Sequence, residues 1–217
     1  MTTFPRSPRV LKGGIVLLNA ATSSIERIIS LQYNPVSLSR TLTGQTIDDA
    51  GRSQPLRLKG PPIETYSLEA EIDAVDQLEF PEQNKEVQEN GIAPILAALE
   101  SMVYPRSSDL LSANGQASSG VLEILPAESP LILFVWSKNR IVPVKITTFS
   151  ITEEAFDPRL NPILAKVSLG MQVLTVDDLG FDHKGGQLYM AYQQQKEQLA
   201  AKFKPGLLST LGINKIP

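Results

Sequence analysis

The segment from Arg140 to Val176 limits the possible folds of this chain most, because its pattern predicts a long β-hairpin. The second arm of the hairpin alternates strictly between two kinds of side chain. A period of two is typical of a strand with one covered face and one wetter face. We expect Ile163, Ala165, Val167, Leu169, Met171 and Val173 on the covered face, and Leu164, Lys166, Ser168, Gly170 and Gln172 on the other.

The first arm of the hairpin also alternates, but its phase changes half-way. Val142, Val144 and Ile146 share one parity, whereas Phe149 and Ile151 share the other. A slip of one residue near Thr147 and Thr148 predicts a β-bulge, which re-aims the side chains of a strand. Between the arms, residues 156–162 (FDPRLNP) contain two prolines and an Asx residue, which predict a turn.

Residues 63–74 form the most regular strand pattern outside the hairpin. Their apolar face carries Tyr66, Leu68, Ala70, Ile72 and Ala74, and the opposite face carries Thr65, Ser67, Glu69, Glu71 and Asp73. Three acids in a row on one strand face are tolerated where that face meets bulk water or a water-filled channel. The pattern leaves both settings open.

The remaining segments predict a β-rich chain with long loops and two short helices. Strands are expected at 14–19, 24–33, 121–125 and 131–136, and amphipathic helices at 92–103 and 188–203. Residues 41–62 and 106–120 are rich in Gly, Pro, Ser and Asn and are expected to be loops, with one short strand at 56–59. Residues 1–12 are expected to be a flexible basic arm.

Composition narrows the class of protein. The 217 residues carry a net charge of -3, which argues against a broad basic surface that binds nucleic acid. They include no cysteine, which excludes disulfides and thiolate metal sites. The N-terminal residues lack the apolar core of a secretory signal. No apolar run approaches the ~20 residues that span a bilayer, so we expect no direct membrane insertion.

The usual signatures of catalysis are missing from the sequence. The single histidine, His183, is expected to be a surface residue, and there is no G-x-S-x-G, G-x-x-x-x-G-K-[ST] or strand-linked G-x-G-x-x-G motif. Glu153 and Glu154 are adjacent on a strand and therefore point to opposite faces. We expect no enzyme activity, no catalytic residue, no cofactor and no metal.

Four segments in this order resemble a known family. They are LQYNPVSLSRTLT (31–43), GPPIETYSLEAEID (60–73), NGIAPILAALESMVYP (90–105) and PLILFVWSKNRIVPVKITTFSITEEAFDPRLNPILAKVSLGMQVLT (130–175). Together they resemble the tube proteins of contractile injection systems, which are phage-tail-like particles, and most resemble the baseplate tube adaptors or initiators of the extracellular type. The resemblance covers roughly residues 10–180, and residues 181–217 do not match the C-terminal LysM domain of many relatives.

The resemblance implies a structural protein that assembles into a hexameric ring. Such a ring would join the spike hub to the inner tube, with baseplate and sheath components nearby, and two hairpins from each subunit would line its channel. The hairpin 140–176 is one candidate for the wall, and either 12–33 or 63–74 is its partner. Candidate channel residues are Thr65, Ser67, Glu69, Glu71, Asp73, Lys166, Ser168 and Gln172, and candidate inter-subunit residues are Asn34, Pro35, Phe156, Asp157, Pro158, Asn161 and Pro162.

The sequence therefore predicts a mainly β (β+α) fold, an antiparallel β-barrel or sandwich of the phage tail-tube type with long hairpins and two short helices. The expected division is an arm at 1–12, a tube-like barrel at 13–180 and a C-terminal helix and tail at 181–217. Such a protein would be made in the cytoplasm and become part of an injection particle. The rival hypothesis is a monomeric β-barrel that binds a small apolar ligand.

Overall fold

The structure is a computed structural model that describes residues 10–19, 22–49, 52–118 and 129–216, with the side chains of 47–49 and 52–56 left out. Its strands are β1 (Gly14–Leu18), β2 (Ile25–Ser30), β3 (Leu38–Thr43), β4 (Thr46–Asp49), β5 (Arg52–Leu58), β6 (Ile63–Asp73), β7 (Leu131–Ser137), β8 (Arg140–Phe156) and β9 (Pro162–Val173). Its helices are α1 (Val75–Leu78), α2 (Lys85–Asn90), α3 (Ala93–Glu100), α4 (Ser107–Ser118), α5 (Val176–Leu179) and α6 (Lys184–Ala200), followed by a 3-10 helix (Leu208–Leu211).

Seven of the strands form one antiparallel sheet in the order β2-β1-β7-β8-β9-β6-β3, and β4 pairs with β5 in a separate hairpin. The predicted mainly β, antiparallel fold is therefore confirmed. The two predicted helices correspond to α3 and α6, and the described residues add four further α-helices. None of these helices has both the length and the apolar character that crossing a lipid bilayer requires.

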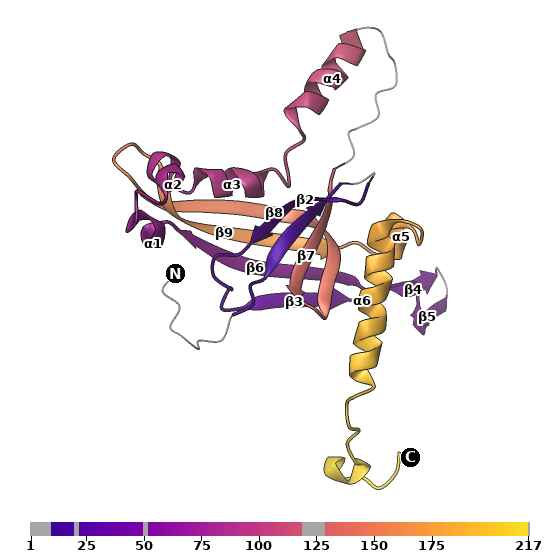
Figure 1. Ribbon diagram of the computed structural model, residues 1–217. Coiled ribbons are helices and arrows are strands. Elements are labelled where there is room, and N and C mark those ends of the chain that lie inside the picture. The colour runs from indigo at the N-terminus through magenta and orange to yellow at the C-terminus, as the bar shows by residue number, and fades with distance from the viewer. Residues whose placement is uncertain (1–9, 20–21, 50–51, 119–128, 217) are drawn as a thin grey trace.

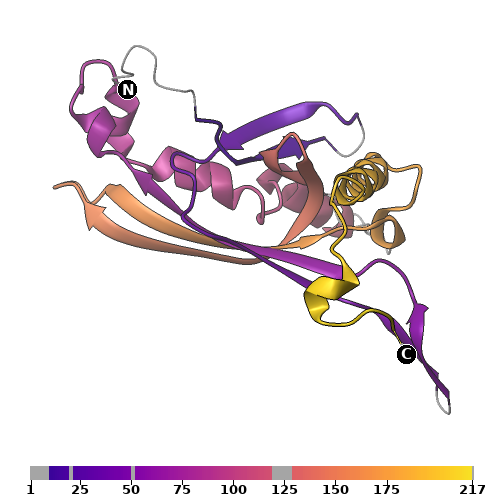
Figure 2. The same cartoon turned by 90° about the horizontal axis from the view of Figure 1, so that it is seen from below.

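The core lies on one side of the long strands. Figure 2 shows β8, β9 and β6 as one layer, with α3, α6 and the β1–β2 hairpin together on one side of it. The alternating residues of β9 (Ala165, Val167, Leu169, Met171 and Val173) and of β6 (Tyr66, Leu68, Ala70 and Ile72) are all buried on that side. They share one hydrophobic cluster with residues of α3, β1, β7 and α6, so a single core joins the sheet to its cover.

The predicted hairpin and its bulge are both present. In β8, the pairing with β9 shifts between Ile146, opposite Met171, and Thr148, opposite Gly170. Thr147 is thus the extra residue of the bulge, and the buried parity of β8 changes from Val144 before it to Phe149 after it. The turn is held by Asp157, whose Oδ1 accepts hydrogen bonds from the backbone N–H groups of Arg159 at 2.7 Å and Asn161 at 2.8 Å.

Two segments predicted as loops are ordered. Residues 41–62 contain the end of β3 and the β4–β5 hairpin, which projects from the body in Figure 1. Residues 107–118 form α4, which projects on the opposite side of the sheet from the C-terminal tail. The short strand expected at 56–59 overlaps β5. The prediction of loop for the other ordered residues was wrong, because scattered Gly, Pro and Ser residues do not prevent local pairing or helix formation. The predicted strand at 121–125 and residues 1–9 of the predicted arm lie outside the described residues.

Helix α6 begins at a histidine cap. His183 Nδ1 accepts a hydrogen bond from the N–H of Gly185 at 3.1 Å, which satisfies one of the free donors at the helix N-terminus. The helix packs its first half on the core through Tyr189 and Tyr192, while Leu199 and Phe203 near its end are exposed. Figure 1 shows the chain leaving α6 as a tail that extends past the β3 side of the sheet.

Candidate functional site

The candidate channel residues lie together on the uncovered face of β6 and β9. Thr65 pairs with Gln172, Glu69 with Ser168 and Glu71 with Lys166. Residues paired in register point to the same face of an antiparallel sheet, so these side chains form one continuous surface. The structure brings the predicted set together, with Ser67 opposite Gly170 and Asp73 opposite Leu164. It also makes β6 the neighbour of β9, so that 63–74 is the strand adjacent to the long hairpin.

This surface extends over two further strands that the sequence reasoning did not include. On β8, Lys145, Ser150 and Thr152 pair with Gln172, Ser168 and Lys166 of β9. On β3, Ser39 and Thr41 pair with Ser67 and Thr65 of β6. The polar parity of β8 after the bulge was the signal that could have revealed Ser150 and Thr152. We call the combined surface of β3, β6, β9 and β8 the polar face.

The charges of the polar face are partly paired. Lys166 Nζ lies 2.7 Å from Glu154 Oε1, and this hydrogen bond raises the pKa of Lys166. Glu69 and Glu71 add further negative potential around the same lysine. Because the side chains are solvated, the pair contributes little to stability but sets the local charge pattern.

The layer that carries the polar face ends in two different edges. Strand β7 pairs with β8 only as far as Val144, so that β8 beyond this point pairs with β9 alone among the described strands. On the other side, β3 forms the edge and covers β6 only up to Leu68. Beyond Leu68, the side chain of Gln32 covers the end of β6: it accepts a hydrogen bond from the N–H of Asp73 at 3.0 Å and donates one to the C=O of Asp73 at 2.6 Å. An uncovered edge presents free N–H and C=O groups to another strand.

The candidate inter-subunit residues divide into two groups. Asn34 and Asn161 are engaged within the chain: Asn34 bonds the backbone of Gly13 at 2.9 Å and Leu11 at 2.8 Å, and Asn161 bonds the carbonyl of Glu89 at 2.9 Å. The carbonyl of Pro162 accepts a hydrogen bond from the N–H of Ile92 at 2.8 Å. Asp157 is committed to the turn, as described above. By contrast, Phe156 and Pro158 are exposed.

Asn34 and Pro35 lie beside the acids of the polar face. They line a surface groove of ≈ 380 Å³ together with Tyr33, Val36, Glu69, Glu71 and Asp73. The groove follows the part of β6 that β3 does not cover. Two sets of residues predicted separately from the sequence therefore meet at one sheet edge.

The sequence reasoning missed a buried ionic cluster on the other side of β6. Glu64 shares the parity of Tyr66 and is only 2% exposed. Its Oε1 accepts hydrogen bonds from the Tyr66 hydroxyl at 2.6 Å and the Tyr192 hydroxyl at 2.9 Å. Arg40 Nη1 lies 3.8 Å from the same carboxylate, and Lys196 Nζ 3.6 Å. A buried carboxylate requires such partners.

The cluster fastens α6 to the sheet. Burial raises the pKa of Tyr66 and of Tyr192, with Glu64 adding to both effects, so the hydroxyls remain protonated donors. The Lys196 ammonium lies 4.2 Å from the centre of the Tyr192 ring, which adds a cation–π contact. Parity alone places Glu64 on the covered face, but its partners on α6 are 128 and more positions away and leave no local signal in the sequence.

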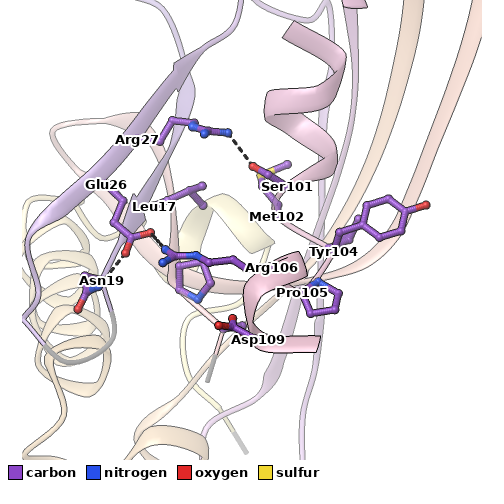
Figure 3. A pocket seen from close by; sticks show the side chains of 13 residues that line it. Leu17, Asn19, Glu26, Arg27, Ser101, Met102, Tyr104, Pro105, Arg106 and Asp109 are labelled. Atoms are coloured by element: carbon purple, nitrogen blue, oxygen red, sulfur yellow. Dashed lines mark hydrogen bonds and ion pairs between the residues drawn. The ribbon is translucent and has the colours of Figure 1, made fainter. Parts of the chain in front are cut away.

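A second pocket, of ≈ 960 Å³, lies between the β1–β2 hairpin and the α3–α4 connection (Figure 3). Several of its polar and charged side chains bond one another. Arg106 bonds Glu26 at 2.7 Å, Arg27 bonds the Ser101 hydroxyl at 2.8 Å, and Asn19 also bonds Glu26 at 2.7 Å. These contacts fix the base of α4 against β2. Within the described ranges, no three His, Asp or Glu side chains gather so as to hold a metal ion.

Comparison with known proteins adds little. No protein-family model matches the chain, and no curated protein matches it either. Among solved structures, it is similar to a chain in the tail of an empty GTA particle refined with C6 symmetry, at 14% identity and a TM-score of 0.29, over 75% of this chain and 90% of that one. A TM-score this low is too weak to assign a family or a function.

Proposed function

We propose that this protein is a structural ring subunit of a contractile injection system, a baseplate tube adaptor that joins the spike hub to the inner tube. The observation that carries the proposal is the polar face, a four-stranded layer whose solvent-facing side is polar and whose two edges differ. The sequence resemblance of residues 10–180 to tube proteins supports it independently. The role is architectural, without catalytic residues or a cofactor.

Two dissimilar edges favour head-to-tail association. The β8 edge of one subunit would pair with the β3 and β6 edge of the next, because unpaired edges readily add a strand. A heterologous contact of this kind closes into a ring when the rotation per subunit fits. The open part of β8 runs from Lys145 to Phe156, about 40 Å at 3.3 Å per residue, which is ample for a strong strand pair.

The same pairing would place the polar face on the inside of the ring. Four strands from each of six subunits would then form a continuous inner barrel. Ser, Thr and Gln side chains together with Glu69, Glu71 and Asp73 would line a water-filled channel that does not adhere to passing cargo. The hub and the tube would contact the two opposite ends of this barrel. The β4–β5 hairpin projects at one of these ends (Figure 1). The protein would be made in the cytoplasm and remain in the assembled particle.

The rival function, binding of a small apolar ligand inside a monomeric barrel, requires an interior larger than its side chains fill. Here the tilted rings of Tyr66 and Phe134 contact each other with their centres 5.4 Å apart, and the centres of Phe134 and Trp136 lie 5.9 Å apart. These rings occupy the space between β6 and β7. The arrangement favours a packed core over a ligand cavity.

The test is the mass and symmetry of the purified protein, alone and with candidate hub and tube proteins, by light scattering and negative-stain imaging. We expect a six-fold ring of the 23.7 kDa chain, alone or on a partner. Lysines introduced at the β8 edge, S150K and T152K together, should prevent ring formation. The control is S168K, which adds charge to the same face on the interior strand β9. A protein that stays monomeric with both partners would overturn the proposal.

A further inference from the structure

The C-terminal tail is an apolar segment that no other described part of the chain covers. Phe203, Leu207 and Leu211 are 78%, 73% and 75% exposed. Clusters of exposed apolar side chains in one segment are typical of binding segments. The tail is also basic, since Lys202, Lys204 and Lys215 are its charged residues and no acid occurs from Gln198 to Ile216.

A groove that is complementary to the tail lies beside β8, on the other side of the layer from β3. It has a volume of ≈ 350 Å³ between the end of α3 and the part of β8 around the bulge, and its lining includes Glu100, Val103, Tyr104, Ile146, Phe149 and Ile151. Tyr104 is 70% exposed and Val103 is also exposed. An apolar floor with a carboxylate at its side matches a segment of leucines flanked by lysines.

The tail points away from the groove of its own chain. Figure 1 shows it extending beyond the β3 side of the sheet, while α3 and α4 lie on the β8 side. Pro205 and Gly206 follow the last helical turn, so the tail leaves α6 as a separate segment. Residues 201–216 span at most about 50 Å when extended, which allows contact with an adjacent subunit.

We infer that the tail of each subunit binds the groove between α3 and β8 of the adjacent subunit in the same ring. The inference rests on the proposed head-to-tail ring, because pairing the β3 and β6 edge with the next β8 edge brings the β3 side of one subunit, past which the tail extends, next to the β8 side of its neighbour, where the groove lies. Phe203, Leu207 and Leu211 would cover Tyr104 and Phe149 of the neighbour, and a tail lysine would approach Glu100. The tail thereby bridges each inter-subunit joint.

The chain has no cysteine, so introduced thiols report this contact directly. Purified L211C and Y104C chains are mixed, assembled and oxidised. We expect a disulfide-linked dimer that forms only when both variants are present in rings. L110C, on the exposed side of α4, replaces Y104C as the matched control and should cross-link much less. Rings that show no L211C–Y104C product would overturn the inference and leave the proposed ring intact.

A truncation after Lys204 provides the second measurement. Since the removed residues are exposed, circular dichroism should be unchanged, while the concentration needed for ring formation should rise at least tenfold. Unchanged assembly would contradict the inference, as would an intramolecular disulfide in a dilute L211C/Y104C double variant. If no ring forms with any chain or partner, the proposed function fails and this inference fails with it.

Discussion

The hydroxyl of Tyr192 donates a 2.9 Å hydrogen bond to the carboxylate of Glu64, although the two residues are 128 positions apart. One belongs to α6 and the other to β6. This contact, with Lys196 from the same helix, adds polar bonds to the packing of Tyr189 and Tyr192 in the core. It also places the start of the tail at a fixed position relative to the sheet.

Replacing Tyr192 by Phe should weaken the attachment of α6. The change removes one donor from a buried carboxylate and keeps the ring, so we expect the free energy of unfolding to fall by about 1–3 kcal/mol. Urea denaturation measures it. Y104F, at an exposed tyrosine, is the control and should change stability by less than about 0.5 kcal/mol. Equal effects of the two substitutions would show that the cluster does not hold the helix.

The buried tyrosines predict alkaline instability. Burial raises the pKa of Tyr66, Tyr189 and Tyr192. A folded-state pKa above the unfolded value of about 10 favours the protonated form in the folded state. The resulting stabilisation is fully present below about pH 10 and is lost as pH rises above it.

Tyrosinate absorbance and circular dichroism, followed together from neutral to alkaline pH, measure this effect. Three of the five tyrosines should ionise only as the secondary structure is lost. Ionisation of all five in the folded protein would contradict the assignment. In Y192F, the late step should involve two tyrosines.

Gly91 is required where the α2–α3 connection meets the hairpin turn. Its φ is +59°, and an added Cβ would overlap the carbonyl oxygen of Pro162. G91A should therefore destabilise the protein by more than about 1 kcal/mol. G115A, in α4 with open space around it, is the matched control and should gain up to about 1 kcal/mol from helix propensity. Thermal unfolding compares them, and a neutral G91A would refute the packing argument.

The Glu154–Lys166 ion pair should affect the charge pattern of the polar face but not the free energy of unfolding. Both side chains are solvated at a surface of the single chain, and such pairs contribute little. We expect K166Q to unfold at the same urea concentration as the wild type. If the polar face lines the channel of a ring, K166Q should still assemble. A marked loss of stability would show that the pair is shielded from solvent.

Period-two patterns predicted the parts of this fold that depend on local order. The faces of 63–73 and 163–173 and the bulge at Thr147 and Thr148 all followed from alternation, and the structure contains each of them. The placement of the candidate channel residues on one surface followed as well. Whether that surface lines a channel stays a prediction, since it depends on other subunits.

The elements that sequence reasoning missed depend on distant contacts. The helix predicted at 188–203 is α6, which buries Tyr189 and Tyr192 but leaves Leu199 and Phe203 exposed, since its end extends past the sheet. Glu64 has the parity of the covered face, and the Tyr192 hydroxyl and Lys196 ammonium from the distant α6 help to make its burial tolerable. The β4–β5 hairpin was hidden by Gly44, Gly51 and Pro55.

The bulge in β8 has a consequence for how the length of this strand can vary among related chains. Because Thr147 is the unpaired residue, deleting it would restore regular alternation and leave Thr148 opposite Gly170. A one-residue deletion between Phe149 and Glu153, where the pairing with β9 is regular, would instead turn the following side chains of β8 to the wrong side. We therefore expect natural insertions and deletions in this regular part of β8 to come in pairs, whereas an odd change is tolerated at position 147.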